Sequence, residues 1–259
     1  MYDSAKRVFI FFVLFLFVGC DIFEYSPYDD DLETNIRDSN SKNISKINSI
    51  LTETETDSFD YALISDTHSD YDYLHDAVKW INRHENIKFT LHLGDQSDSG
   101  LKFEFENTLN ELNKLNNPFI VIIGNHDHLS QGKSIYNTIY GQTNFTFTIG
   151  SSKFIGFDNI VWENANNRPD FDWLQNELNS HNGNLFLLMH IPEGCMSMEL
   201  YKEEYLSIIN QINNLYRFHG HTHCLDDNWP KLITCAITEK MIPVVSVRNQ
   251  NVSYKIESF

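Results

Sequence analysis

The chain has 259 residues, enough for one full domain or two small ones with a buried core. Hydrophobic residues make up 41% of it and aromatic residues 14%, which excludes a wholly disordered chain. The net charge of −17 disfavours binding to a nucleic-acid scaffold, because phosphate backbones are held by Lys and Arg. The negative charge does not exclude binding of a small phosphate ester through metal cations. Four cysteines are too few for a disulfide framework.

The first 20 residues have the pattern of a secretion signal. Lys6 and Arg7 precede an uncharged apolar stretch, residues 8–19, which ends at Cys20. Twelve helical residues span about 18 Å, less than the bilayer core of about 30 Å, so a signal peptide fits better than a permanent membrane span.

Residues 17–20 resemble the lipobox of bacterial lipoproteins, with Gly19 before the cysteine and Phe17 in place of the usual Leu. The resemblance implies a signal peptide at residues 1–19 and a lipid attached to Cys20. An uncleaved N-terminal anchor helix is the alternative. Both interpretations place the remaining chain outside the cytoplasm, anchored to a membrane of a bacterial cell envelope.

Residues 20–57 differ in composition from the rest of the chain. They are polar and acidic, as in Asp29–Asp31 and Thr52–Asp57, and their few apolar residues show no clear period. We interpret this segment as a solvated tether between the lipid and a domain at 58–259. An acidic tail that collects cations is the alternative.

Beyond residue 58, apolar runs alternate with helical periodicity. Leu74, Ala77, Val78 and Ile81 recur at helical spacing, and residues 145–149 alternate as in a half-exposed strand of a hairpin. This rhythm of strand and helix predicts an α/β fold with a largely parallel core. We expect strands at 61–64, 89–93, 119–123, 185–189, 215–218 and beyond 231, and helices at 74–81, 105–112 and 201–212.

Polar motifs follow the predicted strands at once. They are Asp66-Thr67-His68, Gly94-Asp95-Gln96-Ser97-Asp98, Gly124-Asn125-His126-Asp127, His190 and Gly220-His221-Thr222-His223. Ligands of open α/β sheets bind outside the carboxyl ends of the strands, so we expect these side chains to converge. Carboxylates, an amide and imidazoles without a thiolate suit Mn, Fe or Zn better than Ca.

The five motifs, in this order, resemble the calcineurin-like metallophosphoesterase superfamily from about Asp60 to the C-terminus. The resemblance implies two mixed β-sheets packed as a sandwich with flanking helices. It also implies two divalent metal ions. Asp66, His68 and His223 would hold the first ion, Asn125, His190 and His221 would hold the second, and Asp95 would bridge both.

The same resemblance gives His126 a catalytic role at the leaving oxygen, with Asp98 as the acid that orients it. Asp127, His128 and His219 are candidates for contacts behind the ligands. The activity implied is hydrolysis of a phosphate ester by a hydroxide that bridges the two metals. A catalytically inactive surface lipoprotein, acting as a binding or metal-holding module, is the alternative.

The substrate is the least determined feature of the sequence. Ser99 stands where the protein phosphatase branch usually has Arg, which disfavours a phosphoprotein. A small phosphate ester remains, with a phosphodiester slightly favoured over a phosphomonoester. We expect His92 to be packed or to face a sheet edge, and Trp162 to be packed or to line the substrate cleft. The state of Cys195, Cys224 and Cys235 and the number of subunits stay open.

Overall fold

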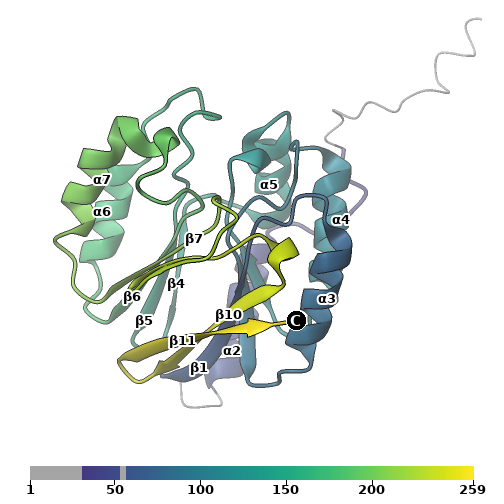
Figure 1. The fold of residues 1–259 in the computed structure, drawn as a ribbon, viewed down its shortest axis with the longest axis horizontal. Helices are drawn as coiled ribbons and strands as arrows, with labels where there is room; N and C mark the ends of the chain where they lie inside the picture. Colours follow the sequence, from purple (N-terminus) through teal and green to yellow (C-terminus); the bar gives the residue numbers. More distant parts are fainter. Residues whose placement is uncertain (1–30, 53–56) are drawn as a thin grey trace, which may run out of the picture.

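The computed structural model of the protein describes residues 31–52 and 57–259. The predicted signal peptide and Cys20 lie outside these residues and stay predictions. Within the described ranges, no helix is both long and apolar enough to cross a membrane. The described chain is built on two mixed β-sheets that lie between two groups of helices (Figure 1).

The first sheet has the strand order β11-β10-β1-β2-β3. Strands β1, β2 and β3 run parallel, while β10 and β11 run antiparallel to their neighbours. The bounds are Ser58–Ile64 (β1), Ile87–His92 (β2), Phe119–Val121 (β3), Met241–Arg248 (β10) and Asn251–Ser258 (β11).

The second sheet has the order β4-β5-β6-β7-β9-β8. Strands β5, β6, β7 and β9 run parallel, and β4 and β8 add antiparallel edges. The bounds are Phe145–Ile149 (β4), Ser152–Gly156 (β5), Asn184–Leu188 (β6), Leu215–His219 (β7), Asp226–Asn228 (β8) and Lys231–Ile233 (β9). Two mixed sheets in a sandwich confirm the predicted fold class.

The central strands of both sheets are buried on both faces, which explains why they appear in the sequence as continuous apolar runs. In β1, Tyr61 and Leu63 point between the sheets, whereas Ala62 and Ile64 point toward the outer helices. The core between the sheets is rich in aromatic rings; Tyr61 stacks on Phe89 with ring centroids 4.9 Å apart.

Helices cover the two outer faces of the sandwich. Those beside the first sheet are α3 (Tyr71–Asn82), α4 (Lys102–Leu112) and α5 (Gly132–Tyr140), and those beside the second are α6 (Phe171–Asn179) and α7 (Lys202–Ile209). The predicted face of α3 is buried as expected. Among the described residues, short 3-10 helices lie at His126–His128, Met196–Tyr201 and Ile237–Glu239.

The prediction of a solvated tether over residues 20–57 is wrong for Ser39–Thr52, which form helix α2 against the edge strand β3. Its buried face carries Asn40 and Asn43 beside Ile47 and Leu51, and the two amides obscure the helical pattern in the sequence. Asn40 exchanges two hydrogen bonds with the main chain of Val121, of 2.8 and 3.0 Å. These side chains thus cover polar groups of a sheet edge that would otherwise be open.

We predict that Asn40→Ala destabilises the protein by about 1–3 kcal/mol, because the buried Val121 N–H loses its hydrogen-bond acceptor. Asn48→Ala is the matched control, since it makes the same change on the exposed face of α2. Urea unfolding of both variants measures the difference. Equal stability of the two variants would show that α2 does not depend on this contact.

Candidate metal centre

The structure brings the polar residues of all five motifs to one edge, where the parallel strands of both sheets end. Asp66 and His68 follow β1, Asp95 and Asp98 follow β2, Asn125 and His126 follow β3, His190 follows β6, and His221 and His223 follow β7. The two sheets therefore contribute ligand candidates to one centre. Their roles as metal ligands stay predictions.

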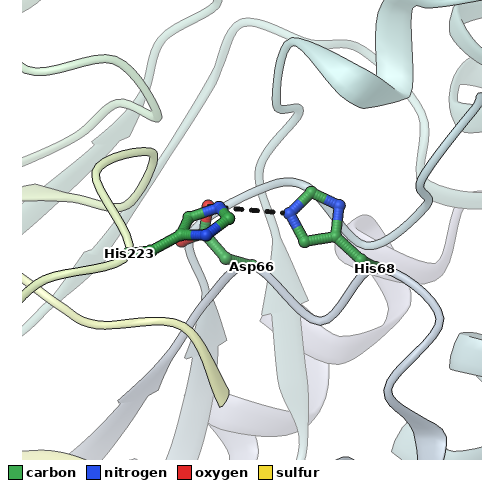
Figure 2. A group of neighbouring side chains, drawn as sticks. All are labelled: Asp66, His68 and His223. Carbon is green, nitrogen blue, oxygen red and sulfur yellow. Dashed lines mark hydrogen bonds and ion pairs between the residues drawn. The ribbon is translucent and has the colours of Figure 1, made fainter. Parts of the chain in front are cut away.

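Asp66, His68 and His223 form the first group that could hold a metal ion (Figure 2). His68 Nε2 and His223 Nε2 are 3.3 Å apart, and His223 Nε2 lies 3.4 Å from Asp66 Oδ1. The Asp66 carboxylate is fully buried, whereas the His223 side chain is 52% exposed. This group is therefore open to solvent on the side of His223.

Asp95, His190 and His221 form the second group. His190 Nε2 lies 3.0 Å from Asp95 Oδ2, and His221 Nδ1 lies 2.9 Å from Asn125 Oδ1, so the Asn125 oxygen lies beside this group. A third group consists of His68, Asp95 and His126. The third group shares His68 with the first group and Asp95 with the second group. Asp95 therefore lies between the two ends of the centre.

The loops that carry these residues are tightly packed against one another. A Cβ atom on Gly124 would lie 2.1 Å from Asp95 Oδ1, and one on Gly220 would lie 2.6 Å from Asp66 Oδ2, so both positions require glycine. Asp66, His68, Asp95, His221 and His223 all have φ between 49° and 75°. Such left-handed conformations are costly for non-glycine residues and are often found at functional sites.

Main-chain amides hold both carboxylates in place. His221 N donates to Asp66 Oδ1 and Oδ2 at 3.0 and 3.1 Å, and His126 N donates to Asp95 Oδ1 at 2.9 Å. Asp127 accepts from Gly124 N at 2.9 Å and from Ser97 N and Oγ at 2.9 and 2.7 Å. Asp127 thus ties the loop after β2 to the loop after β3.

His190 faces two carboxylates from a fully buried position. Its Nδ1–H donates to Leu93 O at 2.7 Å, which directs Nε2 toward Asp95 and, at 3.9 Å, toward Asp66. Burial lowers the pKa of His190, but these carboxylates outweigh it and raise the pKa to about 10.

The donor set fits divalent cations. Burial raises the pKa of Asp95, but the adjacent His190 and His126 hold it well below its usual range. His190 Nε2 is buried against the Asp95 carboxylate, and His68 Nδ1 is buried without a hydrogen bond. Cations between these groups would neutralise the carboxylates and take up imidazole lone pairs.

His126 is oriented differently from the sequence prediction. The sequence predicted that the Asp98 carboxylate orients the His126 ring. Instead, His126 Nδ1–H donates to the main-chain oxygen of Asp98 at 2.6 Å. The nearer carboxylate oxygen is 4.0 Å from that nitrogen and 3.6 Å from His68 Nδ1. Because a carbonyl can only accept, Nδ1 carries a proton and Nε2 is the nitrogen left to act on a substrate.

Three other histidines lie behind the centre. His92 is buried and bonds Thr67 Oγ1 through Nε2 at 2.6 Å, and burial lowers its pKa to about 4. It therefore supports the loop between Asp66 and His68. His128 Nε2 lies 3.2 Å from Asp158 Oδ1. His219 Nε2 is 3.7 Å from Glu193 Oε2. The main-chain N–H of His128 donates to Asn125 O at 3.1 Å, but in the described part of the chain neither imidazole has a hydrogen bond to the side chain of a ligand candidate.

Glu163 is the residue near the centre that the sequence analysis missed. Its Oε1 accepts a hydrogen bond from Asn125 Nδ2 at 3.2 Å. It lies in the loop after β5, outside the five motifs, so no motif spacing marks it. Trp162, beside it, is 52% exposed. Cys195, Cys224 and Cys235 are free thiols.

Comparisons with known proteins agree with this geometry. A family model described as calcineurin-like phosphoesterase matches residues 59–225, more than half of the chain. A search of curated proteins found no match.

Solved structures share the fold at low identity. A dimetal phosphatase from Danio rerio is 13% identical, with a TM-score of 0.63 over 77% of this chain and 96% of that chain. The purple acid phosphatase PPD1 from yellow lupin seeds is 11% identical, with a TM-score of 0.54 over 78% of this chain and 51% of that chain. A protein from Thermus thermophilus is 11% identical, with a TM-score of 0.50 over 76% of this chain and 98% of that chain.

The fold, the clustered His and Asp side chains and the matched family model together define a metal-dependent phosphoesterase. The chain belongs to the calcineurin-like phosphoesterase family.

Proposed function

We propose that this protein hydrolyses small phosphate esters with two divalent metal ions. Asp66, His68 and His223 would hold one ion, Asn125, His190 and His221 would hold the other, and Asp95 would contact both. The observation that carries the proposal is the convergence of these side chains around Asp95, from the strand ends of two sheets. Mn, Fe and Zn suit the nitrogen and oxygen ligands.

When bound, a pair of divalent ions activates a water molecule at neutral pH and stabilises charge on the phosphoryl oxygens. The chain's own residues position and protonate the substrate. His126 is anchored through Nδ1, so in its doubly protonated form Nε2–H is available to the leaving oxygen. Its ring lies against that of His68, with centroids 4.7 Å apart, which places it at the edge of the first group.

The charge around the centre favours a phosphodiester over a phosphomonoester. In the described ranges, no Lys or Arg makes a hydrogen bond or ion pair with the ligand candidates or with His126. A monoester dianion gains more from such cations than a diester monoanion does. Glu163 adds a negative charge beside Asn125, and this charge repels a monoester dianion more strongly than a diester monoanion.

We predict that the metal-loaded protein has a higher kcat/KM for bis(4-nitrophenyl) phosphate than for 4-nitrophenyl phosphate. The measurement is made on protein stripped of metal and then supplied with Mn, Fe, Zn or none. Turnover should require added metal. Absence of turnover with every metal would contradict the proposed function, and a faster monoester reaction would contradict the diester preference.

We predict that His126→Ala keeps its metal ions but loses about 10²–10⁴-fold in kcat on a diester with a poor leaving group. The loss should be smaller with a nitrophenyl ester, because nitrophenolate needs little protonation to leave. The measurements are kcat on both esters and elemental analysis of the same samples.

His221→Ala is the comparison variant for His126. It should lose metal, and excess metal should restore part of its activity. Because one of the three metal-holding groups includes His126, this comparison separates a ligand from a proton donor. Loss of metal from His126→Ala, or an equal loss of kcat on both esters, would show that His126 does not act on the leaving group.

A lipid anchor at Cys20 would hold this activity outside the cytoplasm, on a bacterial cell-envelope membrane. The proposal is supported by the short apolar stretch at residues 8–19 and by Gly19 before the cysteine. Acyl chains on Cys20 would provide the membrane attachment.

We predict that Cys20→Ser abolishes labelling of the protein by radioactive palmitate in growing bacteria. Cys224→Ser, at an exposed free thiol, is the control and should be labelled like the parent. Equal labelling of the Cys20→Ser variant and the parent would rule out lipid attachment at Cys20.

A further inference from the structure

Asn125 can serve the second metal group only if its amide oxygen faces the metal. A side-chain amide presents an acceptor oxygen on one side and a donor NH₂ on the other, and a half-turn about χ2 exchanges them. Asn125 Oδ1 faces His221 Nδ1 at 2.9 Å, and Nδ2 faces Glu163 Oε1 at 3.2 Å. The carboxylate accepts only from the NH₂ group, so a flipped amide would turn its oxygen toward the Glu163 oxygens and lose this bond.

Hydrogen bonds on both sides of Glu163 fix the loop that carries it. Asn159, four residues earlier, pairs with the main chain of Ile191 through Nδ2 at 2.6 Å and Oδ1 at 3.3 Å. The buried Val161 accepts from the main-chain N–H of Asn166 at 2.8 Å, which closes a turn around Glu163. The loop is therefore attached to the segment that follows His190, a second candidate ligand of the same group.

Glu163 also has an unused acceptor. Its Oε2 atom is buried and makes no hydrogen bond in the described part of the chain. Glu163 lies outside the three groups that could themselves hold a metal ion. Its described side-chain hydrogen bond with the centre is the one from Asn125, and its charge also acts on His221.

We propose that Glu163 is a positioning residue for the second metal ion. It binds the Asn125 NH₂ group and so holds the amide oxygen toward the site shared with His190 and His221. The inference rests on the proposed dinuclear centre and adds to it a residue that acts through Asn125. In this inference the hydrogen bond, and not the charge of Glu163, orients the Asn125 amide. A glutamine keeps an acceptor oxygen and can therefore replace Glu163.

The test is calorimetric titration of the metal-free full-length protein with Mn²⁺. The variants are Glu163→Ala, Glu163→Gln, Asn125→Ala and the double variant Asn125→Ala/Glu163→Ala. Glu199→Ala is the matched control, since the Glu199 side chain is 65% exposed and pairs with Lys202. Urea unfolding of each metal-free variant shows whether the fold is kept.

We expect Glu163→Ala to weaken one of two Mn²⁺ sites by about 10–100-fold, the usual effect of removing a group that orients a ligand. The other site should be unchanged. Glu163→Gln and Glu199→Ala should bind both ions within about threefold of the parent. In the Asn125→Ala background, removal of Glu163 should have no further effect, because there is no amide left to orient.

The outcomes separate this inference from the proposed function. A parent that binds fewer than two ions contradicts the dinuclear centre and, with it, the role of Glu163. A parent that binds two ions while Glu163→Ala binds both equally well contradicts only the role of Glu163. Two further results would contradict positioning through the hydrogen bond. One is that Glu163→Gln weakens Mn²⁺ binding as much as Glu163→Ala does, and the other is that Glu163→Ala weakens binding further in the Asn125→Ala background.

Discussion

The structure depends on two buried carboxylates, Asp66 and Asp95, that face one imidazole where the strands of both sheets end. His190 Nε2 lies 3.0 Å from Asp95 and 3.9 Å from Asp66, and all three side chains are buried. Buried charge of this kind is stable only when it is compensated. A bound cation would meet this need. Without one, the two carboxylates raise the pKa of His190.

The surrounding fold serves this arrangement in two ways. Main-chain amides from the loops of both sheets bind the carboxylates, so Asp66 is held by the loop after β7 and Asp95 by the loop after β3. The loops approach so closely that Gly124 and Gly220 leave no room for a Cβ atom. The aromatic core between the sheets then fixes the distance between the strands that carry the loops.

The sequence predicted most of this fold because both faces of the central strands are buried, which yields apolar runs ended by polar motifs. Helix α2 was missed since Asn40 and Asn43 occupy its buried face, where their amides bind the edge strand. The motif order predicted which side chains would meet. It could not predict that the main-chain oxygen of Asp98 would orient His126, nor that Glu163, 38 residues beyond Asn125, would contact its amide. Both contacts depend on the paths of loops, which no residue type specifies.

The central claim is that two metal ions lie close enough to share Asp95, and it is tested most directly by electron paramagnetic resonance of the protein loaded with two equivalents of Mn²⁺. Ions about 3.5–4 Å apart in a shared site are magnetically coupled through their common ligands. The account predicts the spectrum of an exchange-coupled pair in the parent. A spectrum of two isolated Mn²⁺ ions at full loading would contradict it.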